Sequence, residues 1–172
     1  MWTALKQIKK FTAKSELDRV IGRPRFQLED RPAYYYGGGF VVHYSPRAFR
    51  VEGLQRVEYS GPGEYAVGLY HFSTAAALKT ELGLDDFEAD DPAPLEGGIL
   101  DGTITYSSTF DDVHRWAVGR LLEHYQEGET RRLVDGKMTL LHRFIMCDAY
   151  WLYFDGKSRR TKLSGFQFTF KE

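Results

Sequence analysis

Strand-forming segments in this chain follow one another in runs instead of alternating with helices. Seven segments combine aromatic or β-branched residues with turn residues at their ends: 33–44, 49–59, 65–71, 99–106, 137–147, 150–154 and 163–170. Strands joined by short turns pair antiparallel, because a parallel pair needs a long crossover. Amphipathic helices are predicted over 3–21, 74–82 and 109–126. The sequence therefore predicts one α+β domain, residues 1–172, with about three helices packed on one face of a mainly antiparallel sheet of about six to seven strands.

The segment from Gly68 to Leu84 brings a histidine to the end of a predicted strand. His71 shares the apolar phase of Val67 and Leu69, and Ser73 or Thr74 then caps the helix that follows. That phase favours a buried histidine with one ring nitrogen bonded to a backbone carbonyl. The alternative is a catalytic base at a helix N-terminus, which requires His71 to be exposed.

The stretch Leu69-Tyr70-His71-Phe72-Ser73-Thr74 also resembles the opening motif of some ADP-ribosyltransferases. The resemblance covers residues 68–84 and implies that His71 and the following hydroxyl residues help to hold a nicotinamide dinucleotide. The family pattern also has a glutamate on a late strand, and no glutamate lies between Glu129 and Glu172. Because this part of the family pattern is missing, an enzyme of this kind is an alternative function and not the favoured one.

Aromatic residues make up 15% of the chain, and many of them fall on predicted strands. In 150–154 both phases of the strand are aromatic, so one face is core and the other must be covered by a helix, a partner or a ligand. The residues predicted to bind a partner or ligand are Tyr34, Tyr36, Tyr70, Tyr150, Trp151 and Tyr153.

The charge pattern argues against nucleic acid as a partner. The net charge is −1, and one basic cluster occupies a predicted hairpin tip at Lys157, Arg159, Arg160 and Lys162. His114 and His124 lie ten residues apart on one predicted helix, too far to share a metal ion, and residues 85–94 form an acidic loop without the spacing of a calcium site. No metal or cofactor is expected.

The remaining features indicate a cytoplasmic protein. Cys147 is the single cysteine, the N-terminal residues lack a signal-peptide pattern, and no apolar run is long enough to span a bilayer. The favoured function is a non-catalytic domain, of the immunity or accessory type, that binds a protein partner through an aromatic-rich sheet face. A small-molecule pocket within a curved aromatic sheet is the second hypothesis, and the enzyme using His71 is the third.

Overall fold

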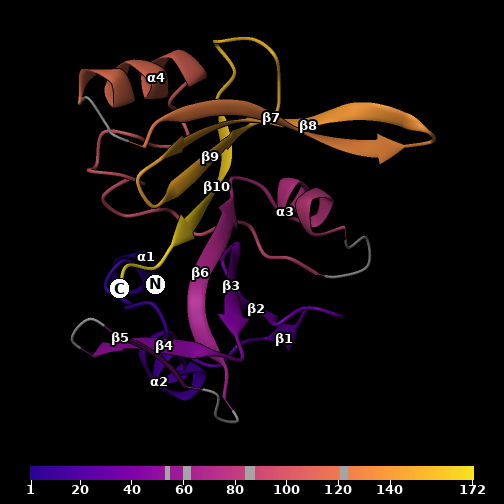
Figure 1. Ribbon diagram of the computed structural model, residues 1–172. Coiled ribbons are helices and arrows are strands. Elements are labelled where there is room, and N and C mark those ends of the chain that lie inside the picture. The colour runs from indigo at the N-terminus through magenta and orange to yellow at the C-terminus, as the bar shows by residue number, and fades with distance from the viewer. Residues whose placement is uncertain (53–54, 60–62, 84–87, 121–123) are drawn as a thin grey trace.

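The protein is described by a computed structural model that covers residues 1–52, 55–59, 63–83, 88–120 and 124–172. Eight strands form one antiparallel sheet in the order β1-β2-β3-β6-β10-β9-β8-β7 (Figure 1). Their bounds are β1 Phe26–Gln27, β2 Ala33–Gly37, β3 Phe40–Ser45, β6 Tyr65–Phe72, β7 Gln126–Val134, β8 Lys137–Cys147, β9 Tyr150–Phe154 and β10 Leu163–Thr169. The predicted α+β class and antiparallel sheet are confirmed. The predicted numbers were too low, because the sheet has eight strands instead of about six to seven, and the described residues form four helices instead of about three.

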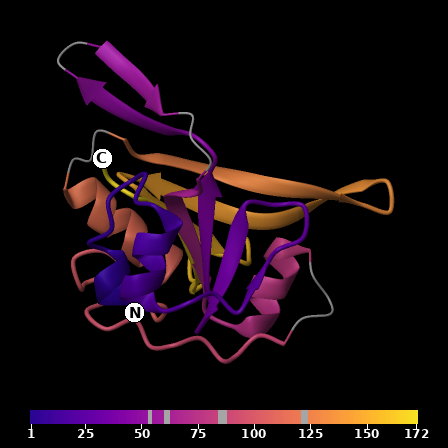
Figure 2. The ribbon, with the colours of Figure 1, turned by 90° about the horizontal axis from the view of Figure 1, so that it is seen from below.

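Helices lie on both faces of this sheet, whereas the sequence predicted one covered face. Their bounds are α1 Trp2–Leu5, α2 Lys14–Ile21, α3 Ala75–Leu82 and α4 Phe110–Gly119. Figures 1 and 2 place α1, α2 and α4 on one side of the sheet and α3 on the other. Each face has its own buried cluster: Phe40, Leu69 and Phe166 belong to the first, and Tyr35 and Phe72 to the second.

Two predicted strand segments, 49–59 and 99–106, have a different structure, and one strand was not predicted. Residues 49–59 are not one strand, because β4 (Ala48–Glu52) pairs with β5 (Gln55–Tyr59) in a separate two-stranded sheet. The short connection between 49–59 and 65–71 also predicts that these segments pair, which is wrong, because β6 pairs with β3 and β10. Residues 99–106 contain turns and bends, whereas Gln126–Val134, which followed a predicted helix, is a strand.

The predicted N-terminal helix over 3–21 is interrupted between α1 and α2. Lys10 N–H donates to Lys171 O and Phe11 N–H donates to Ala66 O, so this stretch of backbone bonds to the sheet. Phe11 also adopts a positive φ of 66°, which a continuous helix excludes. Tertiary hydrogen bonds therefore override the apolar stripe that predicted one long helix.

Both other helix starts are confirmed. Thr74 Oγ1 accepts from Ala77 N–H at 3.0 Å, and Thr109 forms a capping box with Asp112. Gly83 ends α3 in the left-handed conformation, directly after the predicted end of this helix at residue 82. The predicted acidic loop falls partly on residues 84–87, outside the described residues, and 88–94 have no helix or strand.

Candidate functional site: the open part of the sheet face that carries α3

Strand alternation divides the predicted aromatic residues between the two sheet faces. On β9, Tyr150 is 7% exposed in the cluster under α1, α2 and α4, whereas Trp151 and Tyr153 belong to the cluster on the α3 side. Tyr70 of β6 also lies on the α3 side. The six predicted residues therefore do not form one site.

Tyr36 and Tyr34 belong to a polar network beneath α2. The Tyr36 hydroxyl donates to Asp18 Oδ1 at 2.8 Å and is hydrogen-bonded to the Tyr44 hydroxyl. The Tyr34 hydroxyl donates to Glu64 Oε1 at 2.5 Å, and burial with this bond raises the pKa of Tyr34 to about 12. The Tyr36 contacts join α2 to β2 and β3, and the Tyr34 bond joins β2 to the residue before β6, so both tyrosines have structural roles.

The other predicted residues contribute to a row that crosses the sheet on the α3 side. Register places Tyr70, Gln167, Trp151 and Met146 opposite one another on β6, β10, β9 and β8. All four are half-buried, and the His43 ring on β3 meets Tyr70 edge-on at 4.6 Å. These five residues are called the open aromatic face. Helix α3 covers the adjoining part of the same sheet face, over Phe72 and Tyr153.

Two shallow hollows adjoin the open aromatic face and share Thr169. One has a volume of about 290 Å³ and is lined by His43, Tyr70, Gln167 and neighbours. The other, about 450 Å³, is lined by Trp151, Asp148, Glu172 and neighbours. Gly68 of β6 lies between His43 on β3 and Thr169 on β10 and pairs with both. Because glycine has no side chain, none lies at this position between the side chains of His43 and Thr169. The hollow next to His43 follows from this missing side chain.

The open aromatic face contains one polar group that a hydrogen bond orients and one that is buried without a hydrogen bond. The Tyr153 hydroxyl donates to Gln167 Oε1 at 3.2 Å, which leaves the Gln167 amide N–H groups as donors. His43 Nε2 is buried without a hydrogen-bond partner within the described part of the chain. Burial and the charge of Arg31 lower the pKa of His43 to about 4, so the ring is neutral at pH 7.

His71 is a core residue, as the strand phase predicted. It is fully buried, with Nε2 2.9 Å from Gly38 O and Nδ1 2.6 Å from the Tyr106 hydroxyl. Burial lowers its pKa to about 4, and the bond to Gly38 offsets only part of that effect. A neutral ring satisfies both contacts if Nε2–H donates to Gly38 O and Tyr106 donates to Nδ1. The exposure on which a catalytic role for His71 depended is not found.

His142 is a buried ionic site that the sequence analysis missed. Its ring nitrogens lie 2.6 Å from Glu81 Oε2 and 2.8 Å from Asp155 Oδ1, and its side chain is 5% exposed. Burial opposes ionisation, but the hydrogen bonds and charges of Asp155 and Glu81 outweigh it and raise the pKa of His142 to about 9. The imidazolium donates to both carboxylates and joins α3 to β8 and to the end of β9. No local motif marks this histidine, because its partners lie 61 and 13 residues away.

The predicted basic hairpin tip lies in the β9–β10 connection. Arg159 pairs with Asp111 of α4 at 2.6 Å, and Lys157 O accepts from Arg143. Lys162 forms an isolated bridge with Thr109. Part of this cluster therefore anchors α4, and Arg160 is exposed beside it.

Another polar cluster joins α4 to the start of β7. His114 Nδ1 lies 2.7 Å from both the Tyr125 hydroxyl and Glu127 Oε1, and Tyr125 also donates to Glu127. In the sequence, the only role predicted or excluded for His114 is that of a metal ligand. Within the described ranges, no group of three or more His, Cys, Asp or Glu residues is arranged to hold a metal ion.

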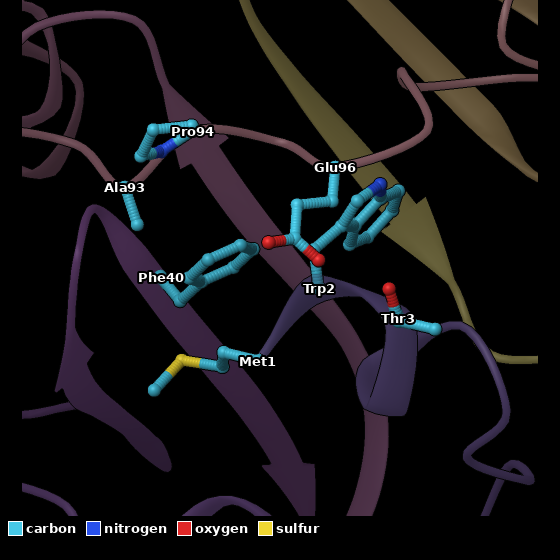
Figure 3. A pocket seen from close by; sticks show the side chains of 7 residues that line it. All are labelled: Met1, Trp2, Thr3, Phe40, Ala93, Pro94 and Glu96. Carbon is cyan, nitrogen blue, oxygen red and sulfur yellow. The ribbon is translucent and has the colours of Figure 1, made fainter.

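A smaller hollow of about 240 Å³ lies beside α1. Figure 3 shows Glu96 and Pro94 from the loop that crosses it, Phe40 from β3, and Trp2. Trp2 is 3% exposed and Phe40 is fully buried, so both rings serve the core. The Trp2 indole N–H donates to Gly98 O at 2.7 Å, which fixes the loop over the sheet.

Comparisons with protein-family models, curated proteins and solved structures return no match. Among the residues that the structure describes, no helix combines the length and apolar character required to cross a bilayer.

Proposed function

We propose that this protein is a non-catalytic binding domain whose open aromatic face docks a protein partner. The observation that carries the proposal is the row of Tyr70, Gln167, Trp151 and Met146, half-exposed across four adjacent strands. Aromatic residues and methionine are enriched at the centres of protein interfaces, and tryptophan and tyrosine contribute most to their affinity.

The surroundings of this row suit a protein better than a small molecule. Ion pairs at its margin, Lys10–Glu172 and Lys171–Asp148, resemble the polar rim of an interface. Small-molecule sites usually enclose most of the ligand surface, whereas both hollows here are shallow depressions along the sheet. The ordered Gln167 amide offers a directional donor within the apolar row.

The test compares proteins captured from a native lysate by the wild type and two matched variants. Gln167→Lys places a charge in the centre of the row, and Gln27→Lys makes the same change at an exposed position on β1. A stoichiometric protein retained by the wild type and Gln27→Lys but lost from Gln167→Lys supports the proposal. Capture that is the same for all three chains, or no stoichiometric protein, overturns it. Thermal unfolding of each variant establishes that the fold is intact.

A further inference from the structure

We propose that β7, the edge strand of the eight-stranded sheet, pairs antiparallel with β7 of a second copy of this chain. This surface is separate from the open aromatic face. β7 spans Gln126–Val134, and within the described ranges it bonds to β8 alone, so its other edge can accept a strand. Figures 1 and 2 show the β7–β8 hairpin projecting from the body of the molecule.

The backbone of β7 is regular along this edge. The register shift in the hairpin lies between the pairs Thr130–His142 and Arg131–Leu140, which leaves Leu141 of β8 as the extra residue. A bulge on β7 would bend the edge and oppose pairing, but this bulge lies on the inner strand.

The hairpin turn determines which β7 residues face outward. Asp135 and Gly136 both have positive φ, and Val134 pairs directly with Lys137, as in a two-residue type I′ turn. The flanking pair of such a turn is hydrogen-bonded, so Val134 and every second residue before it direct their backbone groups to β8. The odd-numbered residues from Glu127 to Leu133 then direct theirs to the open edge.

Charge along β7 selects a second copy as the partner and fixes the register. The acidic residues Glu127 and Glu129 precede Thr130, and the basic residues Arg131 and Arg132 follow it. Charges on an edge strand usually oppose pairing. On β7 the acidic residues lie before Thr130 and the basic residues lie after it. When two copies pair antiparallel with their Thr130 residues opposite each other, Glu129 of each copy lies opposite Arg131 of the other. In the single chain, the side chains of Glu129 and Arg131 are 38% and 54% exposed and form an ion pair with each other.

Neighbouring registers are less favourable. A residue whose backbone groups point to the open edge can pair only with another such residue in the second copy. The register therefore shifts in steps of two residues, and each step gives Glu129 a partner two positions away. One such step places Glu129 opposite Glu129, and the other places Arg131 opposite Arg131. The register centred on Thr130 places Leu133, which is 65% exposed, opposite the second copy's Glu127.

Sedimentation velocity of the full chain and its variants tests the pairing. Glu129→Arg and Arg131→Glu each create two like-charge contacts and should weaken the dimer roughly tenfold or more. The double variant Glu129→Arg/Arg131→Glu restores opposite charges and should recover the wild-type dissociation constant. Glu16→Arg, an equal charge change at an exposed site on α2, should leave it unchanged.

A wild-type chain that stays monomeric across the accessible concentration range overturns the proposal. A dimer that both single variants leave intact, or that the double variant fails to restore, also overturns it. Thermal unfolding of each variant separates loss of pairing from loss of fold.

Discussion

Replacement of His142 by leucine should remove a pH dependence of stability that the wild type shows above neutrality. In the folded protein the pKa of His142 is raised to about 9, against 6.5 for an unperturbed histidine. Between these values the folded chain retains a proton that the unfolded chain has released. The stabilisation that comes from this retained proton is therefore complete below pH 6.5, and it is lost as pH rises through about 9.

The size of the effect follows from the two pKa values. At 1.36 kcal/mol for each pH unit, the full contribution is about 3 kcal/mol, and roughly 2 kcal/mol of it is lost between pH 6.5 and 8.5. Asp155 is 49% exposed, so solvent screens its charge and makes this figure an upper bound. Two other histidines, His43 and His71, have pKa values lowered to about 4, so their effect on stability falls mainly below pH 7.

Urea unfolding at several pH values from 6.5 to 8.5 measures the effect. The wild type should lose about 1–2 kcal/mol across this range, whereas His142→Leu should be nearly flat. His124→Leu, at an exposed histidine, should follow the wild type. A decline in His142→Leu as steep as in the wild type would refute the assignment of the bound proton to His142.

Three other predictions concern the core and are checked by unfolding or labelling. Tyr106→Phe leaves Nδ1 of the buried His71 without a donor, so urea unfolding should show a loss of about 1–3 kcal/mol, and an unchanged midpoint would contradict the assigned hydrogen bond. Gly165→Ala would place a Cβ 2.2 Å from the Phe72 ring, so it should destabilise by about 1–3 kcal/mol, whereas wild-type stability would show that the ring moves freely. Cys147 is fully buried and burial raises its pKa to about 12, so iodoacetamide should label it only after unfolding, as mass spectrometry can show; rapid labelling of the folded chain at pH 8 would be inconsistent with that burial.

Local patterns predicted the parts of the fold that depend on neighbouring residues. Thr74, one of the two predicted caps, begins α3, and α4 follows Thr109 at the predicted start of that helix. The phase of β6 correctly placed His71 in the core. A side-chain cap or a strand phase involves residues a few positions apart, so both are visible in a sequence.

The features that failed depend on distant contacts. The break between α1 and α2 follows from bonds to Ala66 and Lys171, and an apolar stripe contains no sign of either partner. On β6, register shifts between the pairs His43–Gly68 and Tyr44–Ala66, so Val67 is an extra residue and Ala66, not Val67, shares the core face with Leu69.

The candidate site was predictable only in part. Alternation within 150–154 predicted that one aromatic face is core, and that the other needs cover. Tyr153 is covered by α3, whereas Trp151 stays half-exposed. The row from Tyr70 to Met146 could not be predicted, because it depends on the order and register of four strands. Met146 and Gln167 therefore had no sequence signal that linked them to Trp151.

Hydroxyl-radical footprinting of the chain, free and bound to a captured partner, tests the proposed docking surface most directly. Met146 and Trp151 are both oxidisable and lie on the open aromatic face. Met138, which lies on β8 next to the β7–β8 turn and is 59% exposed, serves as the internal control. The proposal predicts that the partner protects Met146 and Trp151 and leaves oxidation of Met138 unchanged. Equal oxidation of Met146 and Trp151 in the free and bound states would contradict docking at this face.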